Sequence, residues 1–255
     1  MEMERLLNFS CEMGRQLMQN GAEIYRVEES MQFLLAAYGC EESEVFAIPA
    51  LIILNIPGEE RNYTKIARVR TSSLNLSRLD LLNALCRDLC RETPDLNEAE
   101  RRFAAIIDEP LQSPLLTLVA HGLVAFFFSL FWGGTLLDAL VAFSCGLILQ
   151  KMVAFMSRVR ANIFFTNLIT SLLLAIPPVT LSALGVGVHV DKIIIGTIML
   201  LVPGIAITNV MRDVLAGDFL TALTRFAEVL IVAMGISIGI AMTITSSRVL
   251  VGWLL

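Results

Sequence analysis

The residues best placed to do chemistry lie in one of the most apolar parts of the chain, between positions 201 and 213. Pro203 and Gly204 follow a run of apolar residues. Proline lacks a backbone donor and clashes with the preceding turn, so it frees carbonyl groups, while glycine leaves room for close approach. Asn209 and Asp213 are four residues apart and share a helix face. This pattern predicts a broken helix that offers polar groups to a hydrated solute at membrane depth.

Other interpretations of these polar residues are purely structural. Prolines also kink structural membrane helices, and clusters of Asp and Arg often only end them. Asn167, deep in an earlier apolar stretch, could face the same site or bond to a neighbouring helix. His121 and Asp138 could change charge state during a cycle, but helix packing is the favoured role for both.

A second polar group lies near the N-terminus, where Glu23, Arg26 and Glu28 fall close together at a predicted helix start. Charges at such a place usually form a solvated face. Both histidines of the chain, His121 and His189, lie in its apolar half, so no serine or cysteine near these charges has a histidine to activate it. With no glycine-rich phosphate loop either, the sequence predicts neither a hydrolase nor an ATP-driven pump, and it suggests no catalytic residue, metal or cofactor.

Composition places these residues in two different solvents. Hydrophobic residues make up 56% of the 255 and charged residues 17%, with a mean hydropathy of +0.71. Most of the charges fall before residue 111. We therefore expect a soluble domain over residues 1–110 and a membrane domain over 111–255. The net charge of −5 argues against nucleic acid as a partner, and the five cysteines, which lack metal-ligand spacing, are read as reduced packing residues.

The first domain is predicted to be α+β. Apolar residues at helical spacing predict helices over residues 4–18, 22–38, 77–92 and 97–107, with Ser77 as the N-cap of the third. Two β-rich runs, 44–56 and 63–71, are joined by Pro57-Gly58-Glu59-Glu60 and predict a hairpin. Pro110 and Pro114 then lead into the apolar region.

The second domain is predicted to be all-α and polytopic, with about five transmembrane helices. The expected spans are 114–133, 135–155, 163–184, 192–211 and 222–245, each near the ~20 residues that cross a bilayer. The N-terminus shows no signal pattern, so the first domain is expected in the cytoplasm. The C-terminus is then outside, and positive charges favour the inner loops: Lys151, Arg158, Arg160, Arg212 and Arg225 inside, against Lys192 and Arg248 outside.

Three segments taken together resemble the threonine/serine exporter family of bacterial membrane proteins. They are Asn20-Gly21-Ala22-Glu23 with Arg26-Val27-Glu28, then Thr64 to Val69, and finally Leu201-Val202-Pro203-Gly204 with Asn209, Asp213 and Gly217. They occur in the family's order over nearly the whole chain. The resemblance implies that Glu23, Arg26 and Glu28 matter in the soluble part, and Pro203, Gly204, Asn209 and Asp213 in the membrane part.

The resemblance also implies gradient-driven export of small polar metabolites across the bacterial inner membrane, either hydroxy amino acids or, in some short members, dicarboxylates such as succinate. Longer members carry about ten spans, so this chain looks like the split form, which a separate small membrane subunit completes; a homo-oligomer is the other way to complete it. The alternative is a membrane-anchored enzyme or sensor whose soluble domain processes or detects the solute.

Overall fold

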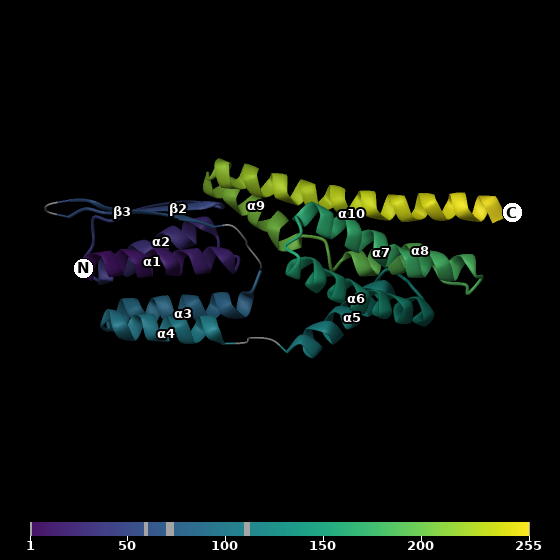
Figure 1. The fold of residues 1–255 in the computed structure, drawn as a ribbon, viewed down its shortest axis with the longest axis horizontal. Coiled ribbons are helices and arrows are strands. Elements are labelled where there is room, and N and C mark those ends of the chain that lie inside the picture. Colours follow the sequence, from purple (N-terminus) through teal and green to yellow (C-terminus); the bar gives the residue numbers. More distant parts are fainter. Residues whose placement is uncertain (1, 59–60, 70–73, 110–112, 255) are drawn as a thin grey trace. The chain divides into compact units, whose positions relative to one another are not determined.

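The computed structural model describes residues 2–58, 61–69, 74–109 and 113–254, with side chains up to residue 247. Contacts divide the chain into two compact units (Figure 1). Unit 1 comprises Met1–Leu111 together with Arg212–Thr224, and unit 2 comprises Gln112–Met211 together with Arg225–Leu255. The predicted turn residues 59–60, the predicted strand end at 70–71 and Pro110 lie outside the described residues.

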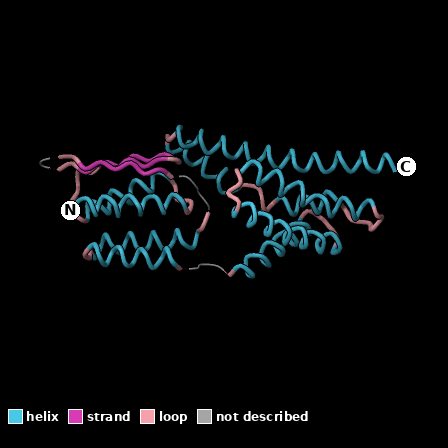
Figure 2. The backbone as a smooth tube through the Cα atoms, viewed as in Figure 1, coloured by secondary structure: helices cyan, strands magenta, loops and turns pink. Residues whose placement is uncertain are grey.

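Unit 1 combines four of the described helices with a small antiparallel sheet of order β1-β2-β3. Every second residue of β2 is buried, namely Ile52, Leu54 and Ile56, so one face of the sheet is apolar. Helices α1 and α2 cover this face, and α3 and α4 pack on the other side of them (Figure 1; strands magenta in Figure 2). The elements are α1 (Glu2–Gln19), α2 (Ile24–Ala37), β1 (Glu44–Ile48), β2 (Leu51–Ile56), β3 (Tyr63–Arg68), α3 (Leu76–Glu92) and α4 (Leu96–Asp108).

Two local predictions for unit 1 need correction. The first β-rich run is two strands rather than one, because the chain reverses at Pro49-Ala50 and Ile48 pairs with Leu51; proline has no N–H to donate to a ladder and favours a turn. The N-cap of α3 is Asn75, whose side chain accepts a hydrogen bond from the Arg78 N–H at 3.0 Å. The hairpin of β2 and β3 is confirmed.

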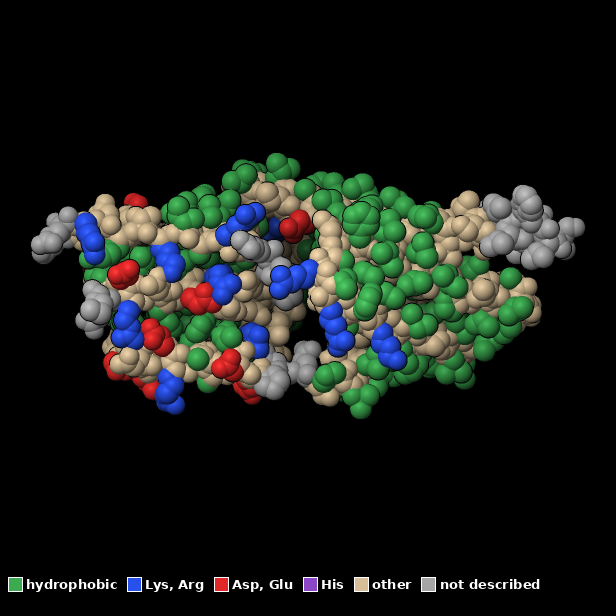
Figure 3. Space-filling model, in the orientation of Figure 1, with side chains coloured by type: hydrophobic (Ala, Val, Ile, Leu, Met, Phe, Trp, Pro, Cys, Tyr) green, Lys and Arg blue, Asp and Glu red, His purple; other side chains and the backbone are tan. Residues whose placement is uncertain are grey.

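Unit 2 is built from helices, and four described helices of the chain are long and apolar enough to cross a membrane. They are α5 (Pro114–Phe131), α6 (Leu136–Arg158), α7 (Ile163–Ala183) and α10 (Phe219–Leu254, of which Phe219–Ser247 meets the criterion). In the view of Figure 3, apolar side chains dominate the surface of unit 2, whereas Lys, Arg, Asp and Glu are spread over unit 1. This contrast fits a multi-pass membrane protein.

The fourth predicted span, 192–211, is not a single helix. It is replaced by α8 (Val190–Ile198) and α9 (Gly204–Ala216), separated by residues 199–203. Neither helix alone covers the ~30 Å of a hydrocarbon core at ~1.5 Å per residue. Helix α8 does not continue through Pro203, because proline disfavours helical geometry in the preceding residue and has no N–H to donate to the preceding turn.

Glycines at positions 235 and 239 allow helices of unit 2 to pack at short range. A Cβ at Gly235 would lie 2.9 Å from the Phe164 carbonyl oxygen, and one at Gly239 would overlap Ser171 and Leu168. Thr243 of α10 also donates a hydrogen bond to the Leu172 carbonyl of α7 at 2.9 Å. Helices α7 and α10 are therefore in backbone-level contact.

Candidate functional site

The first candidate site lies within unit 1, where a sharp turn between α1 and α2 positions its first residues. The Gly21 N–H bonds to the Met18 carbonyl at 3.1 Å and the Ala22 N–H to the Leu17 carbonyl at 3.0 Å, which is a Schellman motif. Gly21 has φ +96°, a conformation that side chains disfavour. The turn leaves Glu23 at the N-cap of α2.

Glu23 is buried, at 8% exposure, and it does not cap the helix with its side chain. Its carboxylate instead forms an ion pair with Arg26 at 2.9 Å and a second one with Arg212. The expectation that these charges form a solvated face is therefore wrong for Glu23, because a buried carboxylate persists as a charge only when it is paired. Arg26 itself remains exposed.

Arg212 reaches Glu23 from the end of α9, where a second Schellman motif ends the helix. The Gly217 N–H bonds to the Val214 carbonyl at 3.1 Å and the Asp218 N–H to the Asp213 carbonyl at 3.0 Å, with Gly217 at φ +84°. Asp213 is 2% exposed, and its side chain is engaged in a polar or electrostatic contact. Arg212, Asp213 and Gly217 thus belong to unit 1, whereas the first part of α9 belongs to unit 2.

Glu28, one turn further along α2, completes this group. Its carboxylate accepts a hydrogen bond from the Ala47 N–H at 2.7 Å. Burial raises the pKa of the Glu28 carboxyl above its usual range, the Ala47 bond opposes that change, and the charge of Asp218 adds to it.

We call Glu23, Arg26, Glu28, Arg212, Asp213 and Asp218 the charge cluster. It holds four carboxyl groups against two guanidinium groups, so acidic groups are in excess. Among the described residues no group of three or more His, Cys, Asp or Glu side chains could hold a metal ion.

The raised pKa of Glu28 makes a prediction for stability. The folded state binds this proton more tightly than the unfolded chain, so the stabilisation is complete below the ordinary glutamate pKa of about 4.3 and is lost as pH rises through the folded pKa. Glu28→Gln keeps an acceptor for the Ala47 N–H and removes the titration. Thermal unfolding in detergent between pH 4 and 8 should show the variant gaining on the wild type as pH rises, with exposed Glu29→Gln as control. Parallel curves for Glu28→Gln and wild type would contradict the assignment.

A separate candidate site, in unit 2, is the break between α8 and α9, which Figure 2 draws as loop. In an unbroken helix the Met199 carbonyl would accept from residue 203, but Pro203 has no N–H. The Leu200 carbonyl would accept from Gly204, whose N–H bonds instead to the Val202 carbonyl at 2.9 Å. A Cβ at Gly204 would meet no atom within 4 Å. The break therefore removes two carbonyls from the helical ladder beside open space.

The remaining predicted residues are more dispersed. Asn209 is half-buried on α9, one turn before Asp213. Asn167 is buried on α7, where its Nδ2 donates to the Ile163 carbonyl at 2.8 Å and its Cβ faces Gly235. Asn167 thus takes part in the contact with α10, and its part in binding a solute stays a prediction.

One interaction in unit 2 was not anticipated from the sequence. Asp138 is fully buried and accepts hydrogen bonds from Thr135 and from both the backbone N–H and the ring Nδ1 of His189, at 2.7 and 2.9 Å. His189 is the N-cap of α8. These hydrogen bonds connect the start of α8 to the start of α6. In the sequence, the only indication was an ionisable residue, Asp138, close to the end of an apolar segment.

Comparison with known proteins identifies a family for this chain. The family model ThrE, threonine/serine exporter, matches residues 8–246. The "Threonine/serine exporter" of Corynebacterium glutamicum is 22% identical over 260 residues, covering 96% of this chain and 52% of that protein. The "Probable threonine/serine exporter" of Mycobacterium tuberculosis (strain ATCC 25618 / H37Rv) is 22% identical over 244 residues, covering 94% of this chain and 46% of that protein.

No solved structure matches the chain. The chain spans about half the length of the curated relatives it matches. The family match, by contrast, extends over nearly all of the chain and includes the residues of both the charge cluster and the helix break. The chain belongs to the threonine/serine exporter family.

Proposed function

We propose that this chain is a subunit of a gradient-driven exporter that moves small polar metabolites out across the bacterial inner membrane. The observation that carries the proposal is the interruption of α8 and α9 at Pro203-Gly204. A solute that leaves water must replace its hydrogen bonds, and backbone carbonyls outside the helical ladder can supply them. Threonine and serine are the first candidates because both relatives carry these solutes in their names; dicarboxylates such as succinate are the second.

The solute would bind beside the break, where three features coincide. The Met199 and Leu200 carbonyls accept from donors such as an ammonium or hydroxyl group. The open space at Gly204 allows the solute to approach the backbone, and Asn209 adds an amide on the following turn. The N–H groups at the start of α9 suit a carboxylate, because a helix N-terminus favours anions.

The proton that drives export would be carried by the charge cluster. Asp213 lies one turn after Asn209 on α9. A change in the charge of Asp213 therefore acts on the helix that begins at the break. Its burial makes the charged form depend on its neighbours. Protonation of Asp213 would thus be linked to the position of α9.

The membrane arrangement follows from treating α8 and α9 as one discontinuous crossing. Residues 190–216 together are long enough to span the bilayer, and with the four long helices this gives five crossings. The N-terminal domain is then cytoplasmic and the C-terminus outside. An odd number of crossings lets a second small membrane subunit supply the inverted half, which agrees with the chain covering half the length of its relatives.

The test compares the metabolites released by cells that lack the chain with those from cells in which it is restored. We expect the restored chain to recover export of threonine, serine or a dicarboxylate. Asp213→Asn should reduce the export rate by about tenfold or more and should abolish the pH dependence of export. Asp88→Asn, a half-exposed carboxylate outside the charge cluster, is the control and should export normally. Normal export with unchanged pH dependence in Asp213→Asn would remove Asp213 from the mechanism, and identical metabolite release with and without the chain would refute export.

A further inference from the structure

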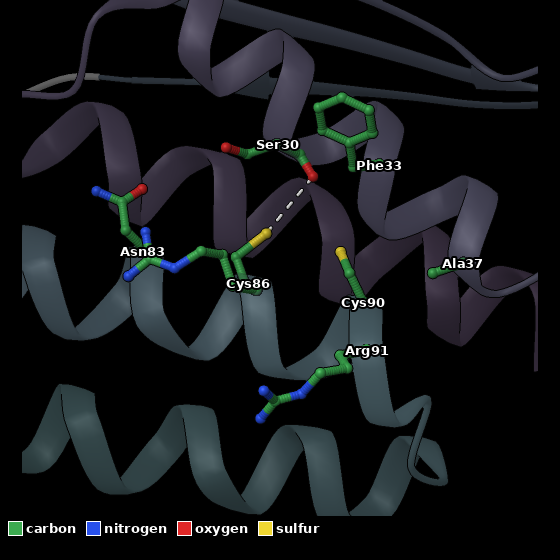
Figure 4. Close-up of a pocket in the computed structure, with 8 residues that line it drawn as sticks. Ser30, Phe33, Ala37, Asn83, Cys86, Cys90 and Arg91 are labelled. Carbon is green, nitrogen blue, oxygen red and sulfur yellow. Dashed lines mark hydrogen bonds between the residues drawn. The ribbon is translucent and has the colours of Figure 1, made fainter.

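A cavity between α2 and α3 lies outside the charge cluster and the helix break. Its volume is about 470 Å³, within the range of small-molecule sites. Figure 4 shows the sulfur atoms of Cys86 and Cys90 on α3 both pointing toward α2, with Phe33 on the facing wall. Phe33 is 67% exposed, so the cavity pairs two thiols with an accessible aromatic ring.

The two thiols differ in their surroundings. Cys86 is buried, at 5% exposure, whereas Cys90 is half-buried. Cys86 carries one proton, which it can direct to the Ser30 carbonyl oxygen, 3.5 Å from its sulfur, or to Cys90. Ionisation of Cys90 favours the second arrangement. A hydrogen bond from Cys86 lowers the pKa of the Cys90 thiol to about 7, while the Cys90 contact and burial raise that of Cys86.

The charge at the cavity is positive. Arg87 and Arg91 of α3 both line it. Arg91 is partly neutralised by Asp88 at 3.3 Å and Glu92 at 3.7 Å, but no ion pair of Arg87 is found among the residues that the structure describes. An unneutralised guanidinium that lines the cavity favours an anionic reactant.

We propose that Cys90 is a modification site at which the cavity takes up an anionic low-molecular-weight disulfide and keeps half of it as a mixed disulfide. The Cys90 thiolate attacks one sulfur of the disulfide and forms a new S–S bond. The original S–S bond breaks, and its other sulfur leaves as a thiolate that takes a proton from water. The reactant supplies the oxidising equivalent, and no other redox partner is needed.

The geometry of α3 keeps the adduct from resolving onto Cys86. Residues four apart on a helix have Cβ atoms about 5–6 Å apart, whereas a disulfide requires about 3.5–4.5 Å. Closing a Cys86–Cys90 bond would require α3 to unwind in the middle of the packed unit. The mixed disulfide is therefore the end product, reversed only by an external thiol.

The test uses the purified full-length chain in detergent, oxidised glutathione as the anionic probe, cystamine as a cationic disulfide, and peptide mass spectrometry. Glutathione should appear on Cys90 about tenfold faster than on the buried Cys11, Cys40 and Cys145. Arg87→Gln, a change at an exposed position, should slow the reaction with oxidised glutathione about threefold to fivefold and not slow the reaction with cystamine.

Further outcomes decide the chemistry. Cys86→Ala removes the thiol that stabilises the Cys90 thiolate, so it should slow modification of Cys90 at pH 7. At pH 9, where the Cys90 thiol ionises without that hydrogen bond, the variant should react at the wild-type rate. Equal modification of Cys90 and the buried cysteines, equal effects of Arg87→Gln on both probes, or a Cys86–Cys90 disulfide as the main product would each overturn the proposal.

Discussion

Replacing Glu23 with Arg, or Arg212 with Glu, is expected to destabilise unit 1, and making both replacements together is expected to recover part of the loss. The Glu23 side chain is 10% exposed and that of Arg212 is 48% exposed, so water screens the pair only in part. Each single replacement sets like charges against each other at a buried position. We expect each to cost about 1–3 kcal/mol.

The recovery in the double replacement is incomplete, because Glu23 also pairs with Arg26. Double-mutant-cycle analysis of thermal unfolding should give a coupling energy of about 1 kcal/mol or more between positions 23 and 212. Arg91→Glu, at an exposed pair with Asp88, is the matched control and should cost about 0–1 kcal/mol. If the two single effects simply add in the double variant, the positions do not interact and the charge cluster lacks its central contact.

Gly239→Ala is expected to disrupt unit 2, whereas Gly204→Ala should leave it folded. A Cβ at Gly239 would overlap Ser171 and Leu168 and lie 2.9 Å from the Leu172 N–H nitrogen, so α7 and α10 must move apart. Overpacking of this kind costs about 1–3 kcal/mol, and more where backbone atoms are the obstacle. At Gly204 a Cβ would meet nothing within 4 Å, and alanine is the better helix former by about 0.5–1 kcal/mol.

The measurement is the fraction of protein that stays monodisperse on size-exclusion chromatography after heating in detergent. Gly239→Ala should lose most of its monodisperse fraction at temperatures at which wild type and Gly204→Ala stay monodisperse. Gly204→Ala has a second use, because the proposed function predicts reduced export from a chain that remains folded. Wild-type stability of Gly239→Ala would show that α7 and α10 are not in close contact.

Much of the fold follows from local patterns in the sequence. Apolar periodicity located α1, α2, α3 and α4 within a few residues, since it depends on neighbours three and four positions away. Length and hydropathy located α5, α6, α7 and α10 for the same reason. Pro203 predicted the break because proline acts on its own turn. The extra reversal at Pro49 was missed, since two short strands joined by a tight turn look like one apolar run.

Only part of the candidate site could be predicted from the sequence. The family resemblance singled out Glu23, Asp213 and Pro203, together with Gly21 and Gly217, and the last two are the residues at which α1 and α9 end in turns. It could not supply the second partner of Glu23, because Arg212 is distant along the chain and any of several arginines would have served equally well.

By itself, then, the sequence determined which helices are long and apolar enough to cross a membrane, that the chain breaks at Pro203, and which residues carry charge, because these depend on the backbone and on nearest neighbours. Only the tertiary structure decided which charges meet. The pairing of Glu23 with Arg212 and that of Asp138 with His189 depend on how distant helices pack, and packing is set by the shapes of many side chains at once.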